Sequence, residues 1–181
     1  MVSDRRKRLI TGKLDLIAAT YDLVCAEIED PVSLAALLGV SVEAGWPPGE
    51  YDRDAQLYFR DRLREGGDSV VGWYGWYAIV RSEAEGHGVL IGSGGFLGPP
   101  GVEGEVEIGY SIMPAWVGLG YATDMVQALT VFAWRDTRIK RIMIRTAATN
   151  HASQRVIEKC GFTFEGEDEK TGTLCFIMKK G

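Results

Sequence analysis

The sequence is poor in the residues that build metal sites and disulfide frameworks. It has 3 cysteines, at positions 25, 160 and 175, and 2 histidines, at positions 87 and 151, among 181 residues. No two cysteines have the spacing of metal ligands, and their odd number argues against a complete disulfide framework. These counts favour a reducing compartment, so we expect a cytoplasmic protein that binds no metal.

Long apolar runs and an excess of positive charge are missing as well. No stretch approaches the roughly 20 apolar residues of a membrane helix. Lys13 and Asp15 interrupt the apolar stretch behind the basic residues 5–8, which argues against an export signal. Asp and Glu number 25 against 20 Lys and Arg, and the resulting net charge of −5 is a poor basis for binding nucleic acid. We therefore expect no membrane and no nucleic-acid partner, whereas an amine-bearing partner fits the charge better.

The remaining composition is that of one globular domain, and we expect residues 1–181 to form it. Helical spacing and capping residues predict helices that begin after Asp30, Asp52, Gly120 and Asn150. Alternating or β-rich stretches predict strands at residues 14–18, 73–80, 88–96, 103–113, 141–146, 162–165 and 174–178. The result is a mixed α+β chain with hairpins early and strands that flank helices late.

A glycine-bearing junction joins the strand at residues 103–113 to the helix that begins near Gly120. Gly118 and Gly120 let the backbone turn tightly, and the first amides of a helix have no partner inside it. Together with the helix dipole, these amides predict a site for an anion such as a diphosphate. A pair of glycines alone is weak evidence, because many strand-to-helix turns carry glycine for steric reasons.

A second junction, at residues 149–162, supplies the context. Its residues follow the pattern Asn-x-x-Ser-x-x-Val-x-x-Lys-x-Gly-Phe, from Asn150 to Phe162. With the first junction and the strand phrase Val-Glu-Ile-Gly-Tyr at 106–110, this pattern resembles the GNAT superfamily of acyl-CoA N-acyltransferases. The likeness is closest to the Rim-type enzymes, which acetylate N-terminal amines of ribosomal proteins. Specific motifs cover about residues 105–162, and the first hundred residues resemble the family only in the order of elements.

The resemblance implies a GNAT fold: a mixed, mostly antiparallel twisted sheet flanked by helices and splayed between two central parallel strands, at residues 105–113 and 141–146. It also implies acetyl-CoA as co-substrate. By position, the backbone of Ile112 and Met113 would pair with the pantetheine arm, and the Asn150 side chain would bind the same arm. The diphosphate would be held by the backbone amides of Val117, Gly118, Leu119, Gly120, Tyr121 and Ala122. The family's Gln or Arg ahead of this loop falls on Ala115, so backbone amides would provide most of the binding.

The resemblance also implies catalytic residues. Glu107 matches a strand glutamate that serves as a base through water, and Glu105, on the same strand face, is the runner-up. The alternative is that both acids lie in solvent near a strand end. The tyrosine that many members use as an acid falls on Ile157. Ser153 matches a serine that Rim-type enzymes can use, but it fits equally well as a first-turn helix residue.

Acceptor-binding residues are expected in the N-terminal half, where Trp46 and Trp76 would contribute to an aromatic wall. We expect direct transfer of an acetyl group to a primary amine, either a peptide N-terminus or a small molecule. Two other interpretations stay open: a catalytically silent acyl-CoA sensor and an unrelated domain with structural glycines. The oligomeric state is open as well, with a homodimer as one option.

Overall fold

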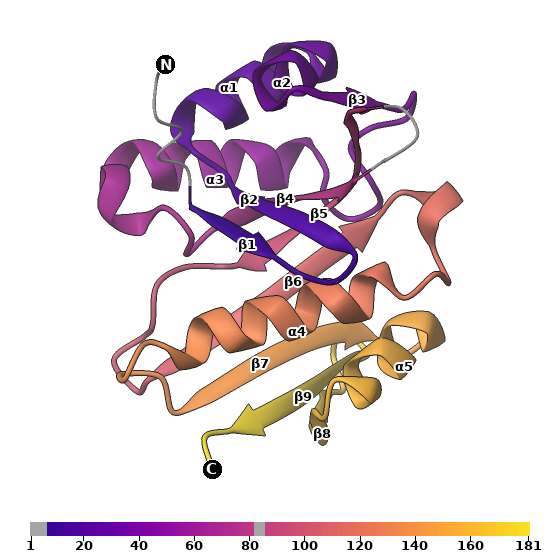
Figure 1. Ribbon diagram of the computed structural model, residues 1–181. Helices are drawn as coiled ribbons and strands as arrows, with labels where there is room; N and C mark the ends of the chain where they lie inside the picture. The colour runs from indigo at the N-terminus through magenta and orange to yellow at the C-terminus, as the bar shows by residue number, and fades with distance from the viewer. Residues whose placement is uncertain (1–6, 82–85) are drawn as a thin grey trace.

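The computed structural model describes residues 7–81 and 86–181, which form a sheet covered by helices (Figure 1). The strands are β1 (Arg8–Ile10), β2 (Leu14–Ala18), β3 (Val40–Val42), β4 (Gly75–Arg81), β5 (Gly88–Phe96), β6 (Glu105–Ile112), β7 (Arg141–Ala147), β8 (Thr163–Asp168) and β9 (Thr173–Lys179). The helices are α1 (Tyr21–Glu29), α2 (Pro31–Leu38), α3 (Arg53–Gly66), α4 (Tyr121–Trp134) and α5 (His151–Lys159). Two short 3-10 turns, Gly67–Val70 and Pro114–Trp116, precede β4 and follow β6.

Side-chain caps begin three of the predicted helices at the expected residues. Asp30, Asp52 and Asn150 each accept a hydrogen bond from a backbone N–H in the first turn of α2, α3 and α5. The start of α4 is different, because its cap is Gly120, with a φ of 86°, and no side chain bonds to its amides. The first turn of α4 therefore keeps its N–H groups available for another acceptor.

The strand order is β1-β2-β4-β5-β6-β7-β9-β8, and β3 pairs with β5 off this path. The pairs β6–β7 and β3–β5 are parallel, and the other pairs among the described residues are antiparallel. This confirms the predicted mixed, mostly antiparallel sheet with two central parallel strands. Strands β1 and β3 were not predicted, because three residues are too few to show an alternating pattern.

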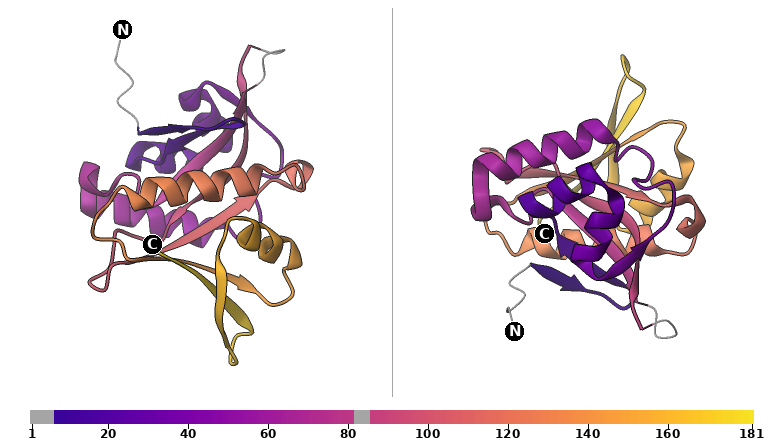
Figure 2. Two further views of the ribbon diagram at one scale, coloured as in Figure 1. Left: turned by 60° about the horizontal axis from the view of Figure 1, so that its bottom comes forward. Right: turned by 90° about the horizontal axis from the view of Figure 1, so that it is seen from above.

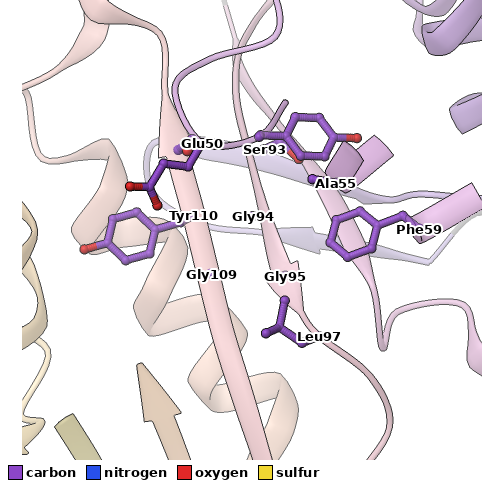
Figure 3. A pocket seen from close by; sticks show the side chains of 11 residues that line it. Glu50, Ala55, Phe59, Ser93, Gly94, Gly95, Leu97, Gly109 and Tyr110 are labelled. Atoms are coloured by element: carbon purple, nitrogen blue, oxygen red, sulfur yellow. The ribbon is translucent and has the colours of Figure 1, made fainter. Parts of the chain in front are cut away.

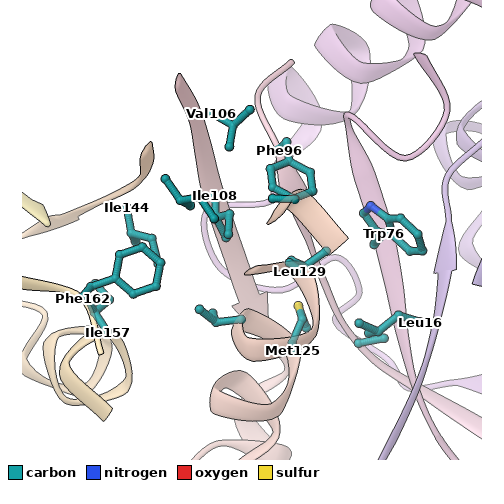
Figure 4. Packing of buried hydrophobic residues seen from close by; sticks show 14 of the residues in the cluster. Leu16, Trp76, Phe96, Val106, Ile108, Met125, Leu129, Ile144, Ile157 and Phe162 are labelled. Atoms are coloured by element: carbon teal, nitrogen blue, oxygen red, sulfur yellow. The ribbon is translucent and has the colours of Figure 1, made fainter. Parts of the chain in front are cut away.

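Helices bury the sheet on both sides (Figure 2). One core lies beneath α1, α2 and α3 and includes Leu23, Leu34 and Phe59. The other lies beneath α4 and α5, where Met125 and Leu129 of α4 pack among side chains of the sheet (Figure 4). Successive residues of β4 therefore enter different cores, because side chains alternate across a strand.

This double coverage corrects the expectation for β4. Trp76, in this strand, was expected to contribute to an aromatic wall that binds the acceptor. Trp76 is 0% exposed in the core beneath α4, and its Nε1 donates to the carbonyl oxygen of Gly72 at 2.9 Å. Tyr77 is 1% exposed in the opposite core. The prediction that Trp76 contacts a substrate is therefore wrong, because both sides of this central strand are covered.

Candidate functional site

The two parallel strands β6 and β7 separate partway along their length. Their pairing covers residues 105–108 and 141–144 and then stops, although both strands continue. The far half of β6 therefore has a paired neighbour only on its β5 side. Unpaired backbone groups at such an edge need partners, which an extended ligand with amide groups can provide.

The backbone bonds of β6 show which residues face this unpaired edge. Met113 donates its N–H to Ile91 at 2.7 Å, and Glu107 accepts from Leu97, so these odd-numbered residues bond toward β5. Because successive residues of a strand direct their backbone groups to opposite sides, Tyr110 and Ile112 face the gap. Ile112 therefore has free backbone groups at the gap, as its expected pairing with the pantetheine arm requires. The N–H of Met113, the other residue expected to pair with that arm, already donates to Ile91. Tyr110 also faces the gap and was not among the predicted residues.

Beside the gap lies the start of α4. The N–H groups of residues 118–123 donate to no other group in the part of the chain that the structure describes. Gly118 and Gly120 have φ of 82° and 86°, in the left-handed region that glycine adopts without strain. A row of free amides at the positive end of a helix dipole is suited to binding a phosphate group.

A cleft of about 460 Å³ joins these two features, and we call it the cleft throughout. It is lined by Gly49, Glu50, Tyr110, Ser111, Ile112, Trp116, Val117, Gly118, Gly120, Ala122, Thr123, Asn150, Ala152, Ser153, Arg155, Val156 and Lys159. Of the predicted coenzyme-binding residues, this set omits Met113, Leu119 and Tyr121. Asn150 uses its Oδ1 to cap α5 at 3.0 Å, which leaves its Nδ2 amino group for a ligand.

Basic side chains lie along the α4–α5 end of the cleft. Arg155 and Lys159 of α5 line it directly. Lys13, from the turn between β1 and β2, donates from Nζ to the Leu119 carbonyl at 3.2 Å and lies 5.9 Å from the centre of the Tyr121 ring. Lys13 could not be predicted from the sequence, because it lies 106 positions from Leu119 along the chain. These cations favour an anionic ligand at this end.

Tyr110 and Ser153 meet inside the cleft. Their hydroxyl oxygens are 2.8 Å apart, and the Tyr110 hydroxyl also donates to the Ser153 carbonyl at 3.3 Å. Burial raises the pKa of Tyr110 to about 12, so its hydroxyl stays protonated in the neutral range. The pair can therefore donate or relay a proton at the point where β6 leaves β7.

The two acids of β6 that were considered as bases are both ion-paired. Glu105 accepts from Arg141 at 2.7 Å, and Glu107 pairs with Arg145. The Glu107 side chain is 19% exposed, and burial raises its pKa although Arg145 acts in the opposite direction. Neither acid lines the cleft. Glu107 lies two residues before Gly109 on the same strand face, about 7 Å along the strand.

A second, smaller cavity of about 190 Å³ lies against the cleft, and we call it the side cavity (Figure 3). Its walls are the loop at Glu50 and Tyr51, α3, β5 and β6, and it is lined by Glu50, Tyr51, Ala55, Phe59, Ser93, Gly94, Gly95, Leu97, Gly109, Tyr110 and Ser111. Glu50, Tyr110 and Ser111 also line the cleft, so the two spaces meet there. Trp46, expected at the substrate, is 7% exposed and lines neither space.

Trp46 instead helps to hold a buried carboxylate. Glu27 of α1 is 2% exposed and accepts hydrogen bonds from Trp46 Nε1 at 2.7 Å, the Tyr51 hydroxyl at 2.8 Å and the Tyr77 hydroxyl at 2.7 Å. Trp46 and Tyr51 lie on either side of Glu50 in the loop before α3. The buried acid therefore fixes the loop that forms one wall of both spaces.

The overall arrangement matches acetyltransferases of known structure. The ribosomal-protein α-N-acetyltransferase RimL has a TM-score of 0.64 at 18% sequence identity, over 99% of this chain and 98% of that chain. The microcin self-immunity acetyltransferase MccE, solved in complex with acetyl-CoA and AMP, has a TM-score of 0.62 at 14% identity, over 94% of each chain. The fold is therefore that of the GNAT acetyltransferases, as the sequence motifs predicted.

Sequence comparison gives the family. A family model described as "Acetyltransferase (GNAT) domain" matches residues 27–163. A Bacillus subtilis (strain 168) protein, named "Uncharacterized N-acetyltransferase YjdG", is 28% identical over 171 residues, which cover 94% of this chain and 98% of that protein. The chain belongs to the GNAT acetyltransferase family and is an enzyme that uses acetyl-CoA.

The described residues contain neither a metal-binding cluster nor a membrane-spanning helix. Over residues 7–81 and 86–181, no group of three or more His, Cys, Asp and Glu side chains is placed to hold a metal ion. No helix in the same ranges has the length and apolar composition that crossing a membrane requires.

Proposed function

We propose that this enzyme transfers the acetyl group of acetyl-CoA directly to a primary amine, with a peptide N-terminal α-amine as the first choice of acceptor and a small-molecule amine as the second. The observation that carries the proposal is the cleft, which joins the uncapped start of α4 to the unpaired edge of β6. Its volume is within the range of about 300–1,000 Å³ that is usual for small-molecule sites. RimL acts on a protein α-amine, which supports the peptide acceptor.

The coenzyme would lie with its diphosphate at α4 and its pantetheine arm along β6. The free amides of residues 118–123 favour the diphosphate, and Lys13, Arg155 and Lys159 add positive charge. Tyr110 and Ile112 would pair with the pantetheine amides through their backbone, and Asn150 would donate from Nδ2. The missing Gln or Arg at Ala115 is thus offset by cations from other elements.

The proposed reaction is a single transfer without a covalent enzyme intermediate. The amine lone pair attacks the thioester carbonyl, a C–N bond forms and the C–S bond breaks. The nitrogen loses one proton and the thiolate gains one, which gives an amide and free coenzyme A. An α-amine has a pKa of about 7.7–8.0, so roughly one in ten is already neutral at pH 7, whereas a lysine amine near 10.4 rarely is. Positioning of the two reactants therefore matters most.

Glu107 is the proposed base, acting through water as the sequence suggested. Burial raises the pKa of its carboxyl group, which brings the group nearer to the pH at which a base works best. Glu107 lines neither the cleft nor the side cavity, so a bridging water would carry the proton to it. Ser153, hydrogen-bonded to Tyr110, is the proposed source of the proton for the leaving thiolate.

Binding and turnover test the proposal separately. Acetyl-CoA should raise the melting temperature, because a ligand that binds only the folded state stabilises it. Release of free thiol in the presence of an amine or an N-terminal peptide should then identify the acceptor. Binding of acetyl-CoA without thiol release for any amine or N-terminal peptide would contradict a primary amine as the acceptor. The cytoplasmic location and the homodimer stay predictions.

The Glu107→Gln variant tests the base. We expect turnover to fall by about 10²-fold or more while acetyl-CoA affinity changes little, because the residue lies outside the cleft. Glu105→Gln is the matched control, because Glu105 lies on the same strand face as Glu107 and is also paired with an arginine. Steady-state kinetics with acetyl-CoA and a peptide acceptor would measure both variants. Equal turnover of Glu107→Gln and wild type would remove Glu107 from this role.

A further inference from the structure

The side cavity differs from the cleft in its charge. Glu50 is the charged side chain among the residues that line it, and the other lining residues are apolar, glycine or hydroxyl-bearing. The Glu50 side chain is exposed and has no hydrogen bond or ion pair with any described residue. The α4–α5 end of the cleft has Arg155 and Lys159 instead. This difference separates an end that favours phosphate from an end that favours an amine.

The side cavity is also small, and one glycine leaves it open. Its volume of about 190 Å³ is below the roughly 300 Å³ at which sites for drug-sized ligands begin. Gly109 of β6 faces it, and a Cβ added there would meet nothing within 4 Å. The φ of Gly109 is not positive, so other residues could adopt this backbone. The space beside β6 is therefore open because residue 109 has no side chain, although the backbone there does not require glycine.

The loop that carries Glu50 is held in place from the interior. Trp46 and Tyr51 both donate to the buried Glu27 carboxylate. Glu50 is next to Tyr51 in the chain and lies beside Tyr110 at the junction of the two spaces (Figure 3). A carboxylate carried by this loop can accept N–H hydrogen bonds from an amine and leave the lone pair of the nitrogen free to attack.

We propose that the side cavity is the acceptor site, that Glu50 binds the amino nitrogen there, and that the limited space left open by Gly109 selects an amine whose attached group is small. This inference rests on the proposed acetyltransferase function and names its substrate class. Two sources supply this chemistry: a peptide whose first side chain is small, and a free amine of similar size. A bulky first residue, such as Leu or Trp, should therefore react more slowly than Gly, Ala or Ser.

The test uses the full-length protein, acetyl-CoA and two matched sets of probes. One set is tetrapeptides that differ only in the first residue (Gly, Ala, Ser, Leu or Trp), and the other is the corresponding amino-acid amides. We expect kcat/KM to be at least about 10-fold higher for Gly, Ala and Ser than for Leu and Trp. A preference for the peptides or for the amides identifies the source of the acceptor.

Variants then test the two named residues. Glu50→Gln should lower kcat/KM for the best probe by about 10- to 100-fold through a higher acceptor KM, the effect expected for one charged hydrogen bond. Glu50→Asp should recover part of this loss, and Glu103→Gln, the same charge change at an exposed position outside both spaces, should have no effect. Gly109→Val should block the acceptor and Gly109→Ala should narrow the range of probes. Gly166→Ala, at another strand glycine with open surroundings, is the control.

The outcomes separate this inference from the function on which it rests. If acetyl-CoA does not raise the melting temperature of the wild type, the coenzyme site fails and the acceptor site fails with it. If acetyl-CoA binds but no small probe is acetylated, or bulky probes react equally well, the acceptor class is wrong and the coenzyme site stands. If Glu50→Gln behaves like Glu103→Gln, or Gly109→Ala like Gly166→Ala, that residue has no part in acceptor binding.

Discussion

At the scale of single residues, Glu27 shows how a carboxylate can be kept in the interior. An ionised acid is costly to bury unless donors surround it. Here three aromatic side chains from two segments donate to it. Burial nevertheless is the largest influence on Glu27 and raises its pKa above the usual 4.5, although these hydrogen bonds lower it. The loop at Glu50 is therefore tied to an acid that is sensitive to pH.

Replacing Glu27 by Gln should destabilise the fold by about 1–3 kcal/mol. The NH₂ group of Gln is a donor and would face a side chain that now donates to the carboxylate, so that side chain would lose its acceptor. The folded state holds the Glu27 proton more tightly than the unfolded chain does. The contribution of Glu27 to the wild-type free energy of unfolding should therefore decrease as the pH rises from about 4.5 through the raised pKa of Glu27. The wild type should exceed the variant most below about pH 4.5, where Glu27 is protonated in both states. Denaturant unfolding at several pH values measures this, with the exposed Glu29→Gln as control. A pH-independent difference would contradict it.

The Tyr110–Ser153 pair allows a second prediction at this scale. Tyr110→Phe and Ser153→Ala each remove one end of a 2.8 Å hydrogen bond. If the pair delivers a proton as a unit, each change should lower kcat by about 10²-fold. The double variant should then be little worse than either single one, because effects within a unit are not additive. Thiol-release kinetics on all four proteins test this. Fully additive losses, or a change confined to the KM for acetyl-CoA, would show that the two residues act separately.

At the scale of elements, the site depends on two irregularities in otherwise regular structure. The sheet loses one row of hydrogen bonds where β6 leaves β7, and α4 begins without a side-chain cap. Either feature alone would leave polar backbone groups without partners. Side by side, they form one continuous surface of free N–H and C=O groups that an extended, phosphorylated ligand can satisfy.

Gly120→Ala tests the start of α4. An alanine at φ 86° is strained by about 1–2 kcal/mol, and its Cβ would lie 2.8 Å from the Lys13 Nζ. We expect lower stability together with an increase of about 10-fold or more in the Kd for acetyl-CoA, equivalent to about 1.4 kcal/mol. Gly172→Ala is the control, since Gly172 also has a positive φ but has open surroundings outside both spaces. It should lose stability and keep its affinity. Calorimetric titration and thermal melting provide both readouts.

At the scale of the whole molecule, the local charge near the start of α4 is opposite in sign to the net charge of the chain. The chain carries −5 overall, yet Lys13, Arg155 and Lys159 come together near the free amides of α4. Two of these cations belong to α5 and the third to the turn between β1 and β2. The anionic coenzyme would therefore meet a local positive field on an acidic protein.

This distribution predicts that the binding of acetyl-CoA depends on salt. The Kd should increase as ionic strength rises from about 50 to about 500 mM, because screening weakens attraction between exposed charges. The double variant Arg155→Gln/Lys159→Gln should bind acetyl-CoA more weakly at low salt, and its Kd should vary less with salt. Lys170→Gln, in the turn between β8 and β9, should change neither. A Kd that does not vary with salt would show that backbone amides alone hold the phosphates.

The order of elements and the coenzyme motifs were predictable because they are local. Capping residues, glycines and apolar periodicity act within a few residues, so the helices after Asp30, Asp52, Gly120 and Asn150 were found from sequence. The positions of Trp46 and Trp76 were not, because aromatic residues fit a buried core as well as a ligand wall. Glu50 carried no sequence signal at all, since its place beside Tyr110 depends on how two distant segments pack.

The sequence by itself determined the helices and the longer strands, the uncapped turn at Gly118 and Gly120, and the motif that identifies the family. These are properties of short stretches, in which neighbouring residues fix backbone conformation. Only the tertiary structure decided which backbone edge is free, which acids are ion-paired, and which side chains line the cleft and the side cavity. Those properties arise where segments far apart in the chain pack together, and local periodicity holds no information about that packing.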